Sequence, residues 1–156
     1  TDGAGLLRYH PEQNRFVTEV VPQGTPEETF RCLLRDSRGR LWATGEQGLL
    51  LRDKGAWTRF GKQDGLLHDH VSYIAELHSG DLCLSYFEPL GIIRFRLNGG
   101  KLQVLSRVTQ ENGLASDKVY LIGEDDKNNL WVGTGRGIDV FSSQGVWHFT
   151  KEDGVA

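Results

Sequence analysis

Short apolar runs alternate with glycine-rich polar turns along the chain, and this pattern predicts many short strands. Runs such as "DLCLSY" and "NLWVG" are bounded by acidic, Asn or Gly turns. No long stretch shows the helical period of 3.6 residues. Glycine is abundant, with 20 residues, and proline is scarce, with 4. Short strands between such turns favour an all-β fold.

The pattern repeats along the chain. Each repeat opens on an apolar strand, at Phe30, Val71 and Val119, so the period is 41 and then 48 residues. Twelve residues after each start lies a common position, held by Trp42, Cys83 and Trp131. Because the two tryptophans recur with the repeat, we expect both to lie mostly in the core. The middle repeat carries a two-residue insertion in "SYFEPLG". A period of 40 to 50 residues is typical of β-propeller blades.

Each repeat contains four short strand candidates, and four antiparallel strands make one propeller blade. We therefore predict β-propeller blades over residues 29–69, 70–117 and 118–156. Residues 1–28 are predicted to form the outer half of an earlier blade. About three and a half blades are fewer than a typical propeller has, so we expect a fragment of a larger propeller.

The segment "GTGRG" holds three closely spaced glycines, Gly133, Gly135 and Gly137, which could form a phosphate-binding loop or a tight turn between two strands. A phosphate-binding loop would need a helix after it, whereas "IDVF" reads as a strand. The same phase of an earlier repeat holds "TGEQG", without the glycine spacing. We therefore interpret the glycines as a turn between the second and third strands.

Composition excludes several classes of partner. The net charge is −3, and no basic block is present, so no nucleic-acid partner is expected. No apolar run reaches the roughly 20 residues that cross a bilayer, so direct membrane insertion of this segment is not expected. Cys32 and Cys83 lie in apolar runs and are interpreted as small buried side chains rather than as a disulfide or a reactive thiol.

The repeat resembles the two-component regulator propeller repeat. The segments that carry the resemblance are "LIGEDDKNNLWVGTGRGIDVF" with "HFTKEDGV", and "LLRDSRGRLWATGEQGLLL" with "RFGKQDGLL". The middle repeat departs from the pattern at Cys83 and in its insertion. Streptogramin-lyase-like propellers use similar turns, and the "ENGL" ending favours the sensor family.

The resemblance implies a ligand-sensing extracytoplasmic module of a bacterial membrane-bound receptor, a histidine kinase or a diguanylate cyclase. It implies a periplasmic or extracellular location, a small-molecule ligand such as a saccharide, and no catalytic motif. The expected protein partners are the remaining blades, and an open blade edge favours self-association. Two alternatives stay open: a propeller lyase or hydrolase, and a protein-interaction scaffold.

Candidate chemistry beyond the resemblance is sparse. The "HDH" triplet, with His68 and His70, falls in a connection between blades, so no metal site is predicted. The carboxyl pair Asp125–Asp126 lies in a strand–strand turn, where Asp binds its own backbone. We predict no catalytic residue and no cofactor in this segment, and hence no enzyme activity.

Ligand-binding residues are predicted where loops vary between repeats. Turns between the second and third strands should share one face with the connections between blades. The insertion carries Tyr86, Phe87 and Glu88, and either it presents an aromatic side chain to solvent for a ligand or it packs on the neighbouring blade. Arg136 can pair with an anionic group. The predicted ligand-binding residues are Glu46, Gln47, His68, His70, Tyr86, Glu88, Lys118 and Arg136.

Overall fold

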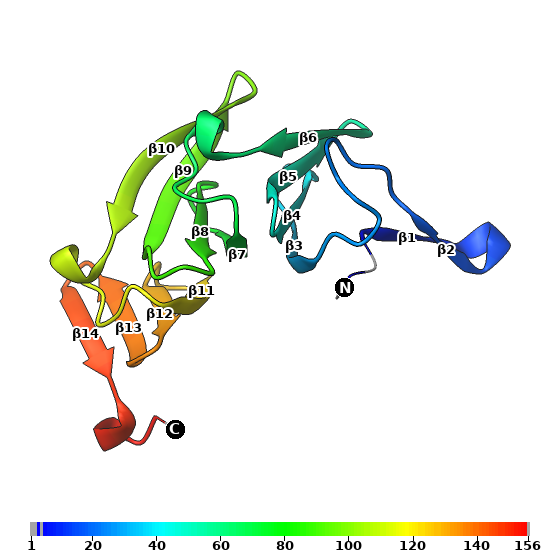
Figure 1. Ribbon diagram of the computed structural model, residues 1–156. Coiled ribbons are helices and arrows are strands. Elements are labelled where there is room, and N and C mark those ends of the chain that lie inside the picture. Colours follow the sequence, from blue (N-terminus) through cyan, green and yellow to red (C-terminus); the bar gives the residue numbers. More distant parts are fainter. Residues whose placement is uncertain (1–2, 4, 156) are drawn as a thin grey trace. The chain divides into compact units, whose positions relative to one another are not determined.

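The computed structural model describes residues 3 and 5–155, and short antiparallel strands dominate it (Figure 1). The strands are β1 (Leu7–His10), β2 (Arg15–Thr18), β3 (Phe30–Arg35), β4 (Leu41–Gly45), β5 (Gly48–Asp53), β6 (Ala56–Phe60), β7 (Val71–Glu76), β8 (Leu82–Tyr86), β9 (Ile92–Asn98), β10 (Lys101–Val108), β11 (Val119–Glu124), β12 (Leu130–Thr134), β13 (Gly137–Ser142) and β14 (Gly145–Phe149). Single 3-10 turns follow β1, β6, β10 and β14, namely η1 (Pro11–Gln13), η2 (Lys62–Asp64), η3 (Gln110–Asn112) and η4 (Lys151–Asp153).

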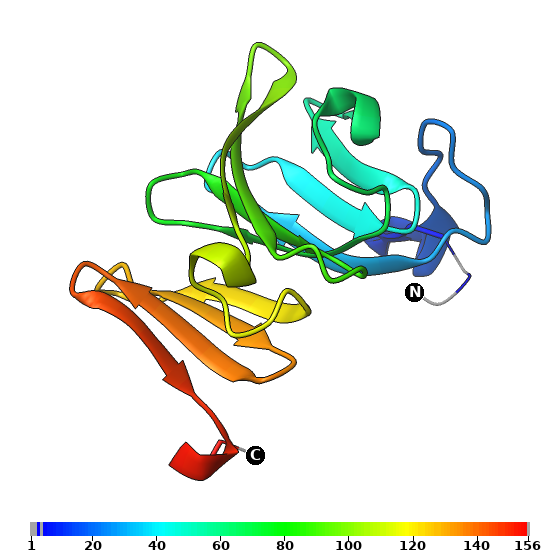
Figure 2. The ribbon, with the colours of Figure 1, turned by 60° about the vertical axis from the view of Figure 1, so that its left-hand side comes forward.

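The strands form three four-stranded sheets and one two-stranded sheet. In each larger sheet, strands adjacent in sequence are also adjacent in space, in the orders β3–β4–β5–β6, β7–β8–β9–β10 and β11–β12–β13–β14. Figure 2 shows the strands of the last of these sheets side by side, in yellow to red. No α-helix occurs within residues 3 and 5–155. The prediction of an all-β fold made of four-stranded propeller blades is confirmed.

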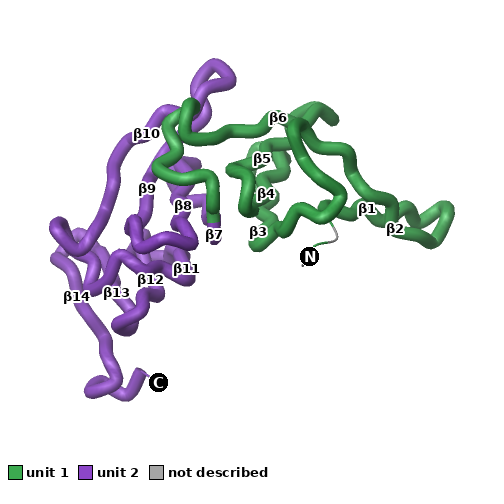
Figure 3. Tube along the Cα trace, in the orientation of Figure 1, with its two compact units in different colours: residues 1–71 green, residues 72–156 purple. Residues whose placement is uncertain are grey.

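The chain divides into two compact units, residues 1–71 and 72–156 (Figure 3). The first unit holds the β1–β2 and β3–β6 sheets. The second holds the β7–β10 sheet, apart from Val71, and the β11–β14 sheet. Each predicted repeat contains one four-stranded sheet, and residues 1–28 contain the two-stranded one, while the exact blade boundaries stay a prediction.

The core of the second unit lies between its two sheets. Side chains of the β7–β10 sheet pack there against Leu114, which precedes the next sheet, and against residues of its first two strands, β11 and β12. The buried members of this core are Leu77, Cys83, Ile92, Leu114, Val119, Ile122 and Val132. One blade therefore buries its apolar face against the apolar strands of the blade that follows it.

Glycine is required where the second strand turns into the third. Gly48 and Gly137 open β5 and β13 with φ of +104° and +129°. A Cβ on Gly48 would overlap the carbonyl oxygen of Phe60, and one on Gly137 would overlap that of Phe149. The neighbouring outer strand thus excludes any side chain at this position. The interpretation of "TGRG" as a turn is confirmed, since β12 ends at Thr134 and β13 begins at Gly137.

An aspartate fixes the turn between the first two strands in the first and last blades. Asp36 Oδ1 accepts from the backbone amides of Arg38 and Arg40, and its Oδ2 accepts from Trp42 Nε1 at 2.8 Å. Asp125 repeats this arrangement with the Asn129 amide and with Trp131 Nε1 at 3.0 Å. These carboxylates are occupied by their own turns, as Asp side chains commonly are.

In the middle blade, different residues stabilise the turn between the first two strands. Cys83 replaces the tryptophan and lies opposite Arg94 on β9. Asp81 ends the turn and accepts from Arg94 Nε at 2.8 Å and from Arg96 Nε at 2.9 Å. Burial raises the pKa of the Cys83 thiol to about 12, and the thiol is free. This supports the interpretation of Cys83 as a small core side chain.

The two tryptophans at this repeat position differ in burial. Trp42 is fully buried and its ring stacks on Phe60, with 6.4 Å between centroids. Trp131, which was also expected in the core, is 41% exposed. Its ring lies on a sheet face where Leu121 and Phe149 are exposed as well, so the repeat position alone does not ensure burial.

The turn aspartates predict how stability depends on pH. Burial raises the pKa of Asp36, but hydrogen bonds from Trp42 and Arg40 outweigh burial and lower the pKa overall. A lowered pKa stabilises the fold above the unfolded-state pKa of about 3.9, and this stabilisation is lost as the pH falls through the folded-state pKa.

We therefore expect Asp36→Asn to flatten the dependence of unfolding free energy on pH below about pH 4, where Asp ordinarily titrates. Urea unfolding at a series of pH values between neutral and acid measures that slope. Asp126→Asn, at an exposed position of the equivalent turn, is the matched control. Equal slopes for Asp36→Asn and the unmodified protein would show that Asp36 is not a stabilising carboxylate.

Candidate functional site

Turns between second and third strands meet the connections between blades through backbone hydrogen bonds. Gly48 N donates to Asp69 O at 2.6 Å, and Gly91 N donates to Asp117 O at 2.9 Å. Gly135 N donates to Lys118 O, also at 2.9 Å. The two kinds of loop therefore share one face in each unit, as the sequence predicted.

In the second unit, Lys118 joins the insertion to the last blade. Its ammonium lies 4.3 Å from the centroid of the Phe87 ring and donates to the Phe87 carbonyl oxygen. Its own carbonyl accepts from Gly135, next to Arg136. Two segments distant in sequence are thus held together by one side chain and its backbone.

Tyr86 does not lie in solvent, so the expectation of an exposed aromatic side chain does not hold for this residue. It is the last residue of β8, a strand whose five residues are all buried, and Tyr86 itself is 1% exposed. An inner strand of a blade is covered on both faces, so the insertion reaches solvent only one residue later. Phe87, at 51% exposed, is the aromatic side chain that the insertion presents.

Glu88 and Arg136 complete this part of the second unit. Glu88 is half-buried and forms a tight turn in which Leu90 N donates to its carbonyl oxygen at 2.8 Å. Arg136 is exposed at the tip of the β12–β13 turn, and its Nη1 lies 3.4 Å from Ala115 O. We call Phe87, Glu88, Lys118 and Arg136 the loop cluster.

The loop cluster combines an exposed ring, two cations and a carboxylate. A ring surface stacks against the apolar face of a sugar or of another ring. Arginine supplies a planar fork of donors that matches a carboxylate or a phosphate. A cation over a ring contributes about 0.5–1 kcal/mol at an exposed site, which helps to order Lys118. The arrangement can therefore hold a ligand.

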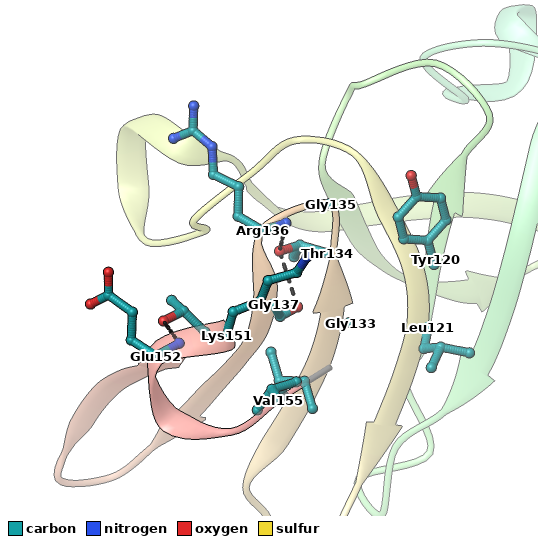
Figure 4. A pocket seen from close by; sticks show the side chains of 12 residues that line it. Tyr120, Leu121, Gly133, Thr134, Gly135, Arg136, Gly137, Lys151, Glu152 and Val155 are labelled. Carbon is teal, nitrogen blue, oxygen red and sulfur yellow. Dashed lines mark hydrogen bonds between the residues drawn. The ribbon is translucent and has the colours of Figure 1, made fainter.

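A recess of about 760 Å³ opens beside Arg136. It lies on a face of the β11–β14 sheet and not at the other residues of the loop cluster. Tyr120, Leu121, Ile138 and Val155 line it together with turn glycines. Figure 4 shows the guanidinium of Arg136 extending away from Leu121 and Val155. The guanidinium of Arg136 thus points out of this recess.

In the first unit, Glu46 and Gln47 occupy the β4–β5 turn and are exposed. They line a polar recess of about 280 Å³ with Arg59, Gln63 and Asp69 among others. Glu46 Oε1 lies 3.8 Å from Arg31 Nη2, which is a loose surface ion pair. Amides and carboxylates of this kind can hydrogen-bond to hydroxyl groups of a ligand.

Arg59 forms the floor of that recess through a buried ion pair with Glu28. Arg59 Nη1 and Nη2 donate to the two Glu28 carboxylate oxygens at 2.8 and 2.7 Å. The side chains are 7% and 0% exposed. Arg59 also donates to the carbonyl oxygens of Pro22 and Gln47. The sequence interpretation missed this pair, although Glu28 stands two residues before a blade's first strand, as Asp69 and Asp117 do.

His68 and His70 lie in the connection that ends the first unit and are half-buried. His70 N donates to His68 Nδ1 at 3.1 Å, so this imidazole nitrogen serves as a backbone acceptor. Within residues 3 and 5–155, no three His, Cys, Asp or Glu side chains gather as metal ligands. The pair thus has a local structural role in the turn.

The predicted ligand-binding residues fall into two separate groups. Lys118, which contacts Phe87, and Arg136 lie in the second unit, and Glu46 and Gln47 line the recess of the first unit. In the part of the chain that the structure describes, no helix is long and apolar enough to span a membrane.

Comparison with known proteins agrees with this architecture. Residues 113–136 match the family model described as two component regulator propeller, a segment that includes Lys118 and Arg136. No curated protein matches the chain.

Three solved structures share the fold. The extracellular domains assigned to the hybrid two component systems BT3049 and BT4673 of B. thetaiotaomicron superpose with a TM-score of 0.77 at 18% identity. They cover 96% and 99% of this chain, which spans only 21% and 23% of theirs. A virginiamycin B lyase from Staphylococcus aureus gives a TM-score of 0.61 at 18% identity, over 90% of this chain and 46% of that one.

Identities this low establish the shared fold and no more. The family match is independent of them, because it rests on the sequence of one repeat. It falls on the segment that joins η3 to the β12–β13 turn, where the repeat pattern of this chain is most complete. The chain therefore has the β-propeller fold of these neighbours, and its residues 113–136 are similar to the two-component regulator propeller repeat, as the sequence indicated.

Proposed function

We propose that this segment is the ligand-sensing part of a bacterial membrane-bound signalling receptor, either a histidine kinase or a diguanylate cyclase. The observation that carries the proposal is the loop cluster: Lys118 and Arg136 lie in the segment that matches the sensor-repeat family, and Lys118 contacts Phe87. The propeller neighbours include extracellular domains of hybrid two component systems. A periplasmic or extracellular location follows from the same proposal.

The ligand class that fits the loop cluster is a saccharide with an anionic group. Phe87 offers a ring face for stacking, and Arg136 offers paired donors for a carboxylate or a sulfate. Glu88 can accept from hydroxyl groups. Phe87 directly follows β8 and Glu88 lies in a tight turn, so these two residues would need little ordering on binding.

Ligand binding would act on signalling by favouring one receptor conformation. A ligand shifts such an equilibrium only by its differential affinity for the two states, which typically amounts to about 1–3 kcal/mol. We expect Arg136→Ala in the intact receptor to raise the ligand concentration needed for a half-maximal response by about fivefold or more. Phosphorylation output or cyclic-dinucleotide production, titrated with a panel of neutral and uronate-containing oligosaccharides, measures this shift.

Two controls separate binding from folding in that experiment. Arg38→Ala removes another exposed arginine, in a strand-one to strand-two turn, and should leave the response unchanged. Arg136→Lys keeps the charge and loses the planar fork, so an intermediate response is expected. The proposal is wrong if Arg136→Ala and Phe87→Ala both respond as the unmodified receptor does.

We also propose that this segment is not itself an enzyme. In support, Asp36 and Asp125 are engaged by their own turns, and His68 accepts a backbone hydrogen bond. The lyase neighbour shares the fold at low identity. Incubation of the receptor's whole propeller with the binding oligosaccharide, followed by mass spectrometry, should recover it unchanged, and cleavage or elimination products would favour the lyase alternative.

A further inference from the structure

The chain contains two Asn–Gly steps, and the structure holds their asparagine side chains in opposite ways. Asn98–Gly99 lies at the tip of the β9–β10 hairpin, and Asn112–Gly113 ends η3. An asparagine that precedes glycine is especially prone to spontaneous deamidation, because glycine has no Cβ to shield its backbone nitrogen from the preceding side chain. The surroundings of each side chain then decide whether the reaction can occur.

The surroundings of Asn98 are open. Asn98 is the last residue of β9 and lies opposite Lys101, the first residue of β10. Gly99 and Gly100 connect the two strands with φ of +56° and +79°, and both are exposed, as Asn98 is. Beyond the adjoining residues, no atom lies within 4 Å of the place that a Cβ on either glycine would occupy. Within residues 3 and 5–155, the Asn98 carboxamide has no hydrogen-bond partner, so it can rotate toward the Gly99 nitrogen.

The Asn112 side chain is held in place by two hydrogen bonds. Its Oδ1 accepts from Thr109 N at 2.6 Å, and its Nδ2 donates to Arg107 O at 3.0 Å. These bonds direct the carboxamide toward the residues before it, whereas the nitrogen that would attack belongs to the residue after it. Asp64 and Asp153 occupy the same repeat position, and each accepts from the backbone amide three residues earlier. The turn that ends a blade therefore keeps this side chain away from its glycine.

We propose that Asn98 is a site of spontaneous deamidation and that its capping hydrogen bonds protect Asn112 from the same reaction. The backbone nitrogen of Gly99 loses its proton to a solvent base and attacks Asn98 Cγ. The new C–N bond closes a cyclic succinimide, the Cγ–Nδ2 bond breaks, and the nitrogen takes up a proton from water and leaves as ammonia. Water then adds to either carbonyl of the ring, which opens to aspartate or to isoaspartate.

Either product adds a negative charge to a basic part of the middle blade. Alternate residues of a strand face the same side, so position 98 shares a face of β9 with Arg94 and Arg96. Both arginines donate to Asp81, which stabilises the turn between the first two strands of this blade. The isoaspartate product also lengthens the main chain at the residue that closes the hairpin. The modification therefore changes both the charge and the strand pairing at this place.

The test compares the two asparagines within one protein. The folded protein is incubated at mildly alkaline pH, which favours the deprotonated amide, and samples are digested at acidic pH, where deamidation is slow. Mass spectrometry with electron-transfer fragmentation distinguishes asparagine, aspartate and isoaspartate at each position. We expect Asn98 to deamidate at least about tenfold faster than Asn112, because two hydrogen bonds of Asn112 must break before its ring can close. In urea, where the fold is lost, both should react at similar rates.

Asn98→Gln is the matched control, since glutamine must close a larger ring. It should abolish the fast reaction in the hairpin and leave the rate at Asn112 unchanged. An Asn98 that reacts no faster than Asn112 in the folded protein would overturn the inference. A rate difference that persists in urea would also overturn it, because the local sequence and not the fold would then be the cause. No ligand takes part, so the outcome is independent of the proposed sensing role.

Discussion

Trp42→Ala is expected to lower the free energy of unfolding by about 3–5 kcal/mol, as the loss of a buried aromatic side chain commonly does. The ring is fully buried in the first unit, stacks on Phe60 and donates from Nε1 to Asp36. Truncation would leave a cavity and remove one of the donors that hold the Asp36 carboxylate. Chemical denaturation followed by circular dichroism measures the loss.

Trp131→Ala is the matched comparison, because it occupies the same position in another repeat. Its ring is 41% exposed and therefore buries less apolar surface in the folded state than Trp42 does. We expect a smaller loss of unfolding free energy, about 1–2 kcal/mol. Equal losses for the two variants would mean that the two tryptophans are equally packed in solution. That result would contradict the burial described for this chain.

Arg59→Ala is expected to destabilise the first unit by about 3–5 kcal/mol, since it leaves a buried carboxylate without its partner. Glu28 is completely buried and receives both of its close donors from Arg59. The guanidinium also ties the Pro22 and Gln47 carbonyls to β6. Urea unfolding at neutral pH measures the effect.

Two variants show whether charge is the cause. Glu28→Gln combined with Arg59→Ala removes the uncompensated charge and should recover part of the lost stability. Arg107→Ala removes the arginine at the same repeat position in the second unit. That side chain is exposed and donates to the Leu90 carbonyl oxygen, so we expect a loss of at most about 1 kcal/mol. A double variant no more stable than Arg59→Ala would assign the loss to packing.

The strands could be predicted because the repeat fixes their phase. Phe30, Val71 and Val119 open first strands at matching positions, and glycine must stand where an outer-strand carbonyl leaves no room for a Cβ. Such constraints act within one blade, so they are visible in any one copy. The burial of Trp131 could not be predicted in this way, because burial depends on what lies against the blade as well as on the blade itself.

The candidate site could be predicted only in outline. The insertion after β8 correctly indicated a variable loop. Whether Tyr86 or Phe87 reaches solvent depends on strand pairing, because a shift of one residue exchanges the buried and the exposed side chain. Lys118 was predicted by its place in a connection, and its contact with Phe87 depends on the meeting of two blades. Long-range contacts of this kind leave no local pattern in the sequence.

The middle blade shows a further limit of reading by repeat. Its turn lacks both the aspartate and the tryptophan of its neighbours, and the Asp81 pair with Arg94 and Arg96 replaces them. Hydrogen bonds from the two guanidinium groups hold the pKa of Asp81 below its usual value, although burial opposes them. The same loop is thus stabilised by different residues, and the Asp-to-Trp spacing of the other two copies is absent from the middle one.

The most direct test of the proposed sensing role is the affinity of the receptor's whole extracellular propeller for uronate-containing oligosaccharides. Isothermal titration calorimetry would compare the unmodified propeller with Arg136→Ala, and with Arg38→Ala as the exposed-arginine control. We predict that an acidic oligosaccharide binds, that Arg136→Ala weakens its binding about fivefold or more, and that Arg38→Ala does not. Unchanged affinity in Arg136→Ala, or no binding by any member of the panel, would contradict a ligand site at the loop cluster.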